Sequence, residues 1–411
     1  MTVLRFEEAR RLVEEHARAA DASTTECVDL LHAAGRVLAQ ETRADRDLPP
    51  FPRATRDGFA VRAADVVAVP ARLKVIAEIR AGQDVTGITV GSGECAEIMT
   101  GAAVPQGADA VVMVEYTMGE GGRTPSSVAT IQRSVASGEN VVPCGAEAKA
   151  NQVLLESRTP LTPAAIAIAA SVGIVQLTVF RQLHIAILAT GDELVNVADR
   201  PLPHQIRNSN TYSLAAQVTR VGAIPIPLPI AADNECSLRT LIEQGLDNDL
   251  LLLSGGVSMG KYDLVEKVLN DLGAEFFFTG VQIQPGKPTV FGRVVYKGRS
   301  KYFFGLPGNP VSTMVTFELF ARPMLEGLSG IAPSPLRFSI AKLKSEVKTK
   351  TGLTRFLPAL VTGEFGNLEV ELVRWQGSGD MVATARANCF AVIPPDREKI
   401  SAGEGINILV P

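Results

Sequence analysis

The chain has 411 residues, enough for roughly two to four domains. Its 46% hydrophobic and 20% charged content excludes a disordered chain, and its 40 Lys and Arg against 44 Asp and Glu leave no basic excess that would favour nucleic acid or anionic lipid as a partner. The five cysteines form no C-x-x-C pair and the four histidines have no metal-ligand spacing, so we expect no disulfide framework, no zinc site and no Ser-His or Cys-His catalysis.

The N-terminal segment is amphipathic and charged. Residues 2–20 are predicted to form a helix capped by Thr2, and residues 25–39 are predicted to form a second helix. The segment lacks the apolar core of a signal peptide, so we expect a cytoplasmic protein.

The most apolar stretch, residues 163–180, is the one candidate for a membrane span. Thr162 followed by Pro163 is typical of a helix N-cap and first turn, and Gly173 is typical of a helix end. This pattern favours a short buried helix followed by a strand, and we expect no membrane partner.

Residues 46–145 are rich in Gly, Pro and short Val/Ile runs, which predicts a β-rich domain with many turns. Residues 146–179 return to a helix and a strand. We therefore expect a discontinuous N-terminal helical and linking domain, made of residues 1–45 and 146–179, into which the β-rich domain is inserted.

Residues 180–330 alternate between apolar strand-like runs (HIAILAT, AIPIPLPI, DLLLLSG) and helical stretches near residues 209–221, 235–245 and 262–272. This alternation predicts a doubly wound α/β domain with a mostly parallel sheet and helices on both faces. Such sheets bind ligands at the carboxyl ends of their strands. Short alternating strands over residues 331–411 predict a small C-terminal β-domain, so the predicted fold class is multidomain α/β and β.

Two loops of the α/β segment directly follow predicted strands. The first, TGDEL, offers Thr190, Gly191, Asp192 and Glu193, a set that suits a polar ligand and Mg²⁺; the alternative is a plain helix start. The second, SGGVSMG, suits an anion because its glycines let backbone N–H groups approach a ligand; its residues are Ser254, Gly255, Gly256, Val257, Ser258, Met259 and Gly260.

The second loop also matches most of a nucleotide-hydrolase phosphate loop, G-x-x-x-x-G-K, which ends here at Lys261. The next residue is Tyr262 instead of the Ser or Thr that would bind Mg²⁺. The match therefore fails at its metal ligand, and a nucleotide hydrolase remains only as an alternative.

Two further loops have rigid, backbone-exposed sequences. Pro285, Gly286, Lys287 and Pro288 hold one ammonium between two prolines, and the loop GLPGNPVS contains Pro307, Gly308 and Asn309 before a predicted helix. Each could be an ordinary turn. Together with the first two loops, they predict a pocket for a phosphorylated, metal-associated ligand.

The β-rich segment adds two loops, RDGFA around Asp57 and IMTGAAVP around Thr100 and Gly101. Taken singly, both are typical of turns. In order along the chain, however, DGFAVRA, IMTGAAVPQGADAVVMVE, TGDEL, IRNSN, SGGVSMG followed by Asp263, PGKP and GLPGNPVS resemble the molybdopterin molybdenumtransferase family, which includes bacterial MoeA-type enzymes and the C-terminal domain of gephyrin.

The resemblance covers nearly the whole chain and implies an elongated homodimer of four-domain subunits with a C-terminal β-barrel. The active site would lie between the α/β domain of one subunit and the β-rich domain of the other. The implied reaction inserts molybdate into adenylyl-molybdopterin with release of AMP, requires Mg²⁺, and receives its substrate by handover from a molybdopterin adenylyltransferase.

The resemblance also implies residue roles. The catalytic residues would be Asp57, Glu147, Asp233, Asp263 and Lys287. The metal ligands would be Asp192, Glu193 and Asp263. The substrate contacts would be Thr100, Gly101, Thr190, Gly191, Ser254, Gly255, Gly256, Ser258, Pro285, Gly286, Pro307, Gly308 and Asn309.

Some positions depart from the family pattern. Glu147 reaches one methylene further than the usual acidic residue, Arg56 and Phe59 replace a Met and a Tyr, and Gln284 replaces a Lys before PGKP. Lys261 stands where an acidic residue is frequent, and one hypothesis is that it supplies the cation lost at Gln284. The departures leave open a tungstate-preferring or paralogous enzyme. A binding scaffold, or a nucleotide-processing enzyme that shares only the α/β domain, also stays open.

Overall fold

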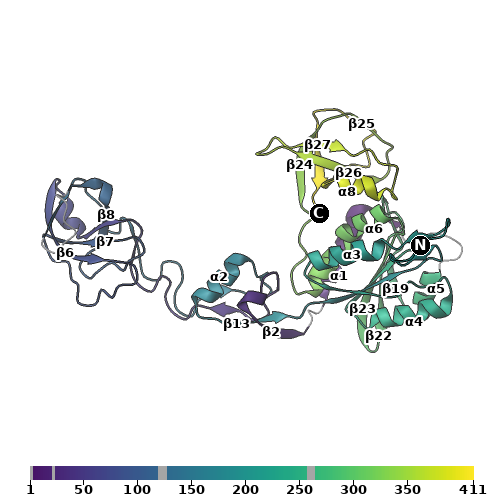
Figure 1. Ribbon diagram of the computed structural model, residues 1–411, viewed down its shortest axis with the longest axis horizontal. Helices are drawn as coiled ribbons and strands as arrows, with labels where there is room; N and C mark the ends of the chain where they lie inside the picture. The colour runs from purple at the N-terminus through teal and green to yellow at the C-terminus, as the bar shows by residue number, and fades with distance from the viewer. Residues whose placement is uncertain (1–2, 21–23, 119–126, 257–263) are drawn as a thin grey trace.

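The computed structural model describes residues 3–20, 24–118, 127–256 and 264–411. Figure 1 shows an elongated chain with the inserted β-rich domain at one end, a small linking domain in the middle, and the α/β and C-terminal domains together at the other end. The described part contains no helix with both the length and the apolar character needed to cross a membrane.

The inserted domain is built on a six-stranded sheet in the order β8-β5-β7-β6-β10-β9. Successive side chains along its strands pack into two apolar clusters on opposite faces of the sheet. Val61 and Val112 belong to one cluster, and Ala60 and Val111 belong to the other. This confirms the predicted β-rich domain. The strands are β5 (Gly58–Val61), β6 (Ala71–Ile79), β7 (Glu94–Ile98), β8 (Ala110–Met113), β9 (Thr117–Met118) and β10 (Val128–Ile131), with the short pair β4 (Arg53–Ala54) and β11 (Val141–Val142) beside them.

Helix α2 (Pro163–Ser171) of the linking domain packs on strand pairs from both flanking chain segments. Thr162 caps α2 by accepting a bond from the Ala165 N–H at 3.3 Å, and Gly173 has a φ of 76°, as the sequence predicted. The strands are β2 (Thr25–Asp29), β3 (Thr42–Arg43), β12 (Val153–Leu155) and β13 (Gln176–Phe180).

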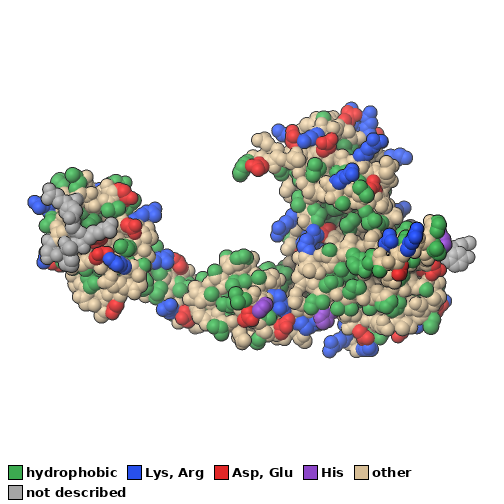
Figure 2. Space-filling view, viewed as in Figure 1, with side chains coloured by type: hydrophobic (Ala, Val, Ile, Leu, Met, Phe, Trp, Pro, Cys, Tyr) green, Lys and Arg blue, Asp and Glu red, His purple; other side chains and the backbone are tan. Residues whose placement is uncertain are grey.

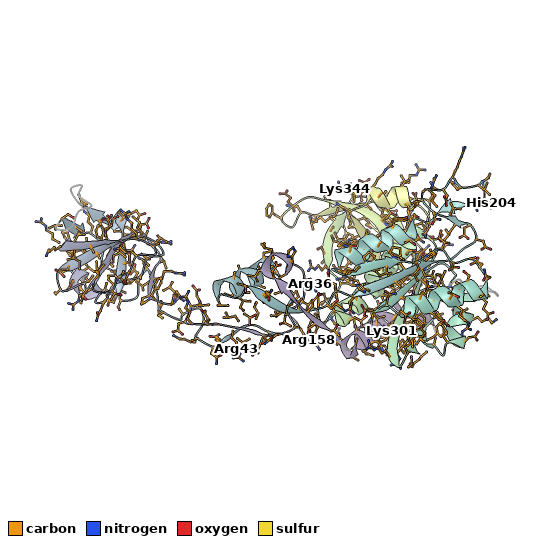
Figure 3. The ribbon with its side chains drawn as sticks, turned by 60° about the horizontal axis from the view of Figure 1, so that its bottom comes forward. Arg36, Arg43, Arg158, His204, Lys301 and Lys344 are labelled. Atoms are coloured by element: carbon orange, nitrogen blue, oxygen red, sulfur yellow. The ribbon has the colours of Figure 1, made fainter. Side chains whose placement is uncertain are left out.

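The predicted helix over residues 25–39 is wrong. Strand β2 pairs antiparallel with β13 along its whole length, and Asp29 then caps a single 3₁₀ turn, η1 (Leu30–His32). Arg36, labelled in Figure 3, donates to the Phe180 carbonyl at 3.0 Å and so fixes the following segment against β13. Pairing with a distant strand has overridden the local helix preference.

The first helix begins later than predicted and packs elsewhere. Strand β1 (Val3–Leu4) pairs with β20 (Gly280–Val281), and α1 follows as Phe6–Ala19. Its buried residues Ala9, Val13 and Ala17 lie in the core of the α/β domain. Helix α1 therefore packs as part of the α/β domain, although its position in the sequence predicts that it belongs to the linking domain.

The α/β domain has a six-stranded sheet in the order β17-β14-β18-β23-β22-β19. The first four strands are parallel, β22 pairs antiparallel with β23, and β19 pairs antiparallel with β22 and so runs in the direction of the first four. The strands are β14 (His184–Ala189), β17 (Ile224–Pro227), β18 (Leu250–Ser254), β19 (Glu275–Phe278), β22 (Val290–Tyr296) and β23 (Arg299–Leu306), with a short parallel pair β15 (Leu194–Val195) and β16 (Ile206–Arg207) outside the sheet.

Helices cover both faces of this sheet, as a doubly wound fold requires. One face packs against α1, α3 (Asn210–Arg220), α6 (Pro310–Thr316) and α7 (Arg322–Leu328), and the other against α4 (Glu235–Leu246) and α5 (Leu264–Asp271). A π-helical turn, η4 (Phe317–Ala321), joins α6 to α7. The predicted doubly wound α/β fold is confirmed.

The C-terminal domain is a closed barrel, because β26 pairs with both β27 and β28 in the sheet order β21-β26-β27-β24-β30-β28. Strand β21 (Ile283–Gln284) comes from the α/β segment and pairs with β26, which ties the two domains together. The other elements are β24 (Phe338–Leu343), β25 (Val347–Lys348), β26 (Thr354–Thr362), β27 (Glu369–Leu372), α8 (Met381–Arg386), β28 (Cys389–Ile393), β29 (Lys399–Ile400) and β30 (Gly405–Leu409).

Candidate functional site

Three of the predicted loops meet at the carboxyl ends of β14, β18 and β23. The Thr190 N–H donates to the Ser254 carbonyl at 3.1 Å, and the Gly255 N–H donates to the Leu306 carbonyl at 3.2 Å. Parallel pairing in register brings these strand ends to one edge of the sheet. The structure thus assembles the TGDEL, SGG and PGNP loops as the sequence predicted for a ligand site.

The two described glycines of the SGG loop are required by close packing. Gly255 has a φ of 89°, and a Cβ there would lie 2.5 Å from the Thr190 carbonyl oxygen. Gly256 has a φ of 62°, and a Cβ there would lie 2.9 Å from the Thr190 Cγ2. Only glycine fits both positions, so these two residues let the loop backbone pack closely against Thr190. Ser258, Lys261, Tyr262 and Asp263 lie outside the described residues.

Two acidic residues at this edge, Asp192 and Asp233, are joined through hydrogen bonds. The Thr190 hydroxyl donates to Asp233 Oδ1 at 2.8 Å, and the Asp233 N–H donates to Asp192 Oδ1 at 3.1 Å. Thr190 is buried, whereas Asp192, Glu193 and Asp233 are exposed. Within the residues described, no cluster of three or more acidic, His or Cys side chains could hold a metal ion, and the predicted set that includes Asp263 stays a prediction.

The PGKP loop is held rigidly while its lysine remains exposed. The buried Thr289 hydroxyl donates to the Gly286 carbonyl at 2.6 Å, and the Val281 N–H donates to the Lys287 carbonyl at 2.9 Å. Gly286 has a φ of 113°, and a Cβ there would lie 2.4 Å from Thr316 Cγ2. The backbone of Lys287 is therefore fixed, and its ammonium is presented to solvent.

The C-terminal barrel contributes residues that sequence reasoning missed. Asn309 Nδ2 donates to the Ser378 hydroxyl at 2.8 Å, and the Val311 N–H donates to the Ser378 carbonyl at 3.1 Å. Arg355 Nε donates to Gln284 Oε1 at 2.8 Å, so a cation from the barrel lies beside the residue that precedes the PGKP loop. The sequence signal for Ser378 is weak: a serine between Gly377 and Gly379.

The second group of predicted residues lies in the inserted domain. Asp57 Oδ1 accepts both the Thr100 N–H, at 2.6 Å, and the Thr100 hydroxyl, at 2.8 Å. These two bonds, the backbone one first, lower the pKa of Asp57 and keep it ionised. Gly58 allows β8 to approach β5 closely, because a Cβ there would lie 1.8 Å from the Val112 carbonyl oxygen. Gly101 turns the chain with a φ of 84°.

Glu147 forms an exposed ion pair with Arg53 at 2.9 Å. A groove of about 380 Å³ in the inserted domain contains none of the predicted site residues; it is lined in part by Pro52, Val104 and Cys144. In one chain the predicted residues therefore lie in two separate regions, the α/β domain and the inserted domain with the adjoining Glu147, at opposite ends of the molecule in Figure 1.

Comparison with known protein families accounts for most of the chain. Sequence models match the MoeA N-terminal region (domain I and II) over residues 4–173, a probable molybdopterin binding domain over 186–327, and the MoeA C-terminal region (domain IV) over 341–410. Similar proteins are molybdopterin molybdenumtransferases of Nostoc sp. (37% identical; 94% of this chain and 88% of the relative) and Bacillus subtilis (34%; 94% and 90%).

Solved structures agree with this match over the full length. Two structures of a molybdopterin biosynthesis MoeA protein from Pyrococcus horikoshii resemble the chain, with 31% identity and a TM-score of 0.74, and with 28% identity and a TM-score of 0.80. In the first pair the alignment covers 100% of this chain and 99% of the other, and in the second it covers all of both.

Proposed function

This chain belongs to the MoeA family of molybdopterin molybdenumtransferases, and on that premise we propose that it inserts molybdate into adenylyl-molybdopterin and releases AMP and molybdenum cofactor. The observation that carries the proposal is the meeting of the TGDEL, SGG and PGNP loops at one edge of the α/β sheet. Glycine-rich backbone and helix starts at such an edge bind phosphate groups.

The reaction brings together two anions, molybdate and a phosphorylated pterin, so the site must supply positive charge. Mg²⁺ takes one or two carboxylates and completes its shell with substrate oxygens and water. Asp192 and Glu193, both exposed at the loop edge, fit this donor set, and Asp263 is the third proposed ligand. A bound Mg²⁺ would screen the phosphate and molybdate charges.

The remaining proposed residues act around that charge. Lys287 holds an ammonium beside the leaving phosphate as the phosphoanhydride bond breaks, and backbone N–H groups of the glycine loops bind its oxygens. In this proposal Asp233, held by the Thr190 hydroxyl, and the ionised Asp57 orient or deprotonate the attacking oxygen. Glu147 completes the proposed catalytic set.

We propose that the active site forms between two copies of the chain. Asp57 and Thr100 lie in the inserted domain, at the opposite end of the subunit from the α/β loops, and Glu147 adjoins that domain through its ion pair with Arg53. They can reach the same substrate only if a second subunit supplies them. The linking domain offers an apolar surface for such pairing: Leu31 is 91% exposed, Val175 is 76% exposed, and Figure 2 shows apolar side chains over α2.

The chemistry of the substrate also indicates which class of reaction must precede this one. An adenylylated pterin is an activated anhydride, so an adenylyltransferase must supply it, and we propose direct handover from that enzyme. We further propose that the reaction takes place in the cytoplasm, without nucleic acid or membrane partners.

The test is AMP release from adenylyl-molybdopterin by the purified protein, with and without Mg²⁺ and with molybdate or tungstate. Release of AMP that needs Mg²⁺ and molybdate supports the proposal. Faster release with tungstate would indicate that tungsten, rather than molybdenum, is the metal that the protein inserts. Tight binding of adenylyl-molybdopterin without release under any condition would contradict catalysis and favour a binding scaffold.

A further inference from the structure

The amide of Asn210, the first residue of α3, joins two of the loops at the sheet edge. Its Nδ2 donates to the Ser254 hydroxyl oxygen at 2.7 Å and to the Gly308 carbonyl at 2.8 Å. The two loops are in van der Waals range at this point, since a Cβ on Gly308 would lie 3.6 Å from the Gly255 Cα. One side chain therefore fixes the spacing of the SGG and PGNP loops.

The direction of these bonds follows from the Gly308 carbonyl, which can only accept. The Asn210 amide must therefore present Nδ2, rather than Oδ1, to Gly308. The same Nδ2 faces Ser254, so the Ser254 hydroxyl oxygen acts as the acceptor in that pair. Its own hydrogen is then left to donate to a third group.

The oxygen of the Asn210 amide indicates that stability alone does not explain why Asn210 bridges the two loops. Asn210 Oδ1 is buried and has no hydrogen-bond partner among the described residues. Leaving a buried acceptor unpaired costs about 1–3 kcal/mol. Asn208, two residues earlier, shows the ordinary structural use of the same residue type: it is buried, accepts the Thr211 N–H at 3.2 Å and donates to the Thr211 hydroxyl at 2.9 Å.

We propose that Asn210 is a positioning residue that sets the Ser254 hydroxyl as a hydrogen-bond donor to a phosphate oxygen of the substrate. This inference rests on the proposed function for the identity of the phosphate, and it deepens that function. Asn210 does not touch the reacting atoms. It acts through Ser254, whose hydroxyl would otherwise be free to rotate and donate elsewhere in the loop.

The test is a double-mutant cycle on affinity for adenylyl-molybdopterin, measured by calorimetry, with Asn210→Ala, Ser254→Ala and the double variant. We expect each single variant to weaken binding by about 10- to 150-fold, the effect of one lost hydrogen bond to a charged group. The double variant should bind about as well as the weaker single one. Additive losses would overturn the proposal, because Asn210 would then act independently of Ser254.

Asn210→Asp gives a second readout. A carboxylate can accept from Ser254 but cannot donate to it, so the polarity of the bond reverses and affinity should fall at least as far as in Asn210→Ala. Asn208→Ala is the matched control, expected to lower Tm without changing affinity. Wild-type affinity in Asn210→Asp would contradict the proposal. If the wild-type protein binds adenylyl-molybdopterin but releases no AMP, the proposed function fails. Loss of affinity in the Asn210 variants would then still support the role of Asn210.

Discussion

Thr100 donates both its backbone N–H and its hydroxyl to a single carboxylate oxygen of Asp57, at 2.6 and 2.8 Å. Both bonds stabilise the charged carboxylate, which lowers the pKa of Asp57. The link between these two motifs of the inserted domain therefore keeps Asp57 ionised.

Thr100→Val should raise the pKa of Asp57, because it removes the hydroxyl bond and leaves only the backbone one. If activity needs the carboxylate, the acid limb of the kcat/KM profile should move to higher pH. The Asp57 pKa can be measured by NMR on the same samples. Thr100→Ser, which retains the hydroxyl, should keep the wild-type profile, and an unshifted limb in Thr100→Val would exclude Asp57 as the group behind it.

Gly255→Ala should damage both stability and ligand binding. The φ of 89° alone costs an alanine about 1–2 kcal/mol, and the 2.5 Å approach of its Cβ to the Thr190 carbonyl should add about 1–3 kcal/mol. Gly273→Ala is a matched control, because Gly273 has a φ of 77° and open space around its Cβ position. Urea unfolding measures the free energy of unfolding of both variants. Equal losses in Gly255→Ala and Gly273→Ala would show that the contact with Thr190 does not affect stability.

Lys287→Ala should weaken affinity for adenylyl-molybdopterin by roughly 1–3 kcal/mol, the value of a charged hydrogen bond. The fold should be unaffected, because the side chain is exposed and the loop is held by Thr289 and Val281. Lys348→Ala, which removes an exposed lysine paired with Glu346 on the barrel, controls for net charge. Equal affinity in both variants would remove Lys287 from the site.

The stability of the protein should fall as the medium becomes acidic, in part because of His16. Burial, followed by the charge of Arg293, lowers the pKa of His16, while Glu275 and Glu15 oppose the shift. The ring stacks on Phe277 with centroids 3.9 Å apart. The unfolded chain therefore takes up this proton first, so stability is present above an ordinary histidine pKa of about 6.5 and is lost as pH falls below it. His16→Phe should make Tm depend less on pH below about 6.5. An unchanged dependence would show that groups other than His16 cause it.

Phe365 occupies a turn position that suits it poorly. It has a φ of 49° and is 98% exposed at the tip of the β26–β27 hairpin. Asn tolerates a positive φ, so Phe365→Asn should stabilise the protein by about 0.5–1 kcal/mol in urea unfolding. Phe338→Asn tests the same exchange in an extended strand and should give no gain. A loss of stability in Phe365→Asn would mean that the ring makes a contact worth more than the strain.

Sequence patterns predicted the elements whose own residues decide their structure. Strands β14 and β18 are short apolar runs buried on both sides, and α2 begins at its Thr-Pro cap as expected. The loops that follow these strands were predicted for the same reason, because parallel strands bring their carboxyl ends to one edge.

The failures share one physical cause, which is long-range contact. Residues 25–29 form a strand because β13, about 150 residues later, pairs with them, and no local pattern reveals that partner. The packing of α1 depends on the remote helix α7. The contacts Asn309–Ser378 and Gln284–Arg355 likewise join residues 69 and 71 positions apart, across two domains.

The most direct test of the account is a heterodimer that carries Asp57→Asn in one chain and Lys287→Ala in the other, isolated with two different tags. At substrate concentrations well below saturation, each variant alone should release AMP much more slowly than the wild type. If each site combines the inserted domain of one subunit with the α/β loops of its partner, one of the two sites in the heterodimer is intact, and it should release AMP at about half the wild-type rate. A heterodimer as inactive as the parent variants would contradict a site shared between subunits.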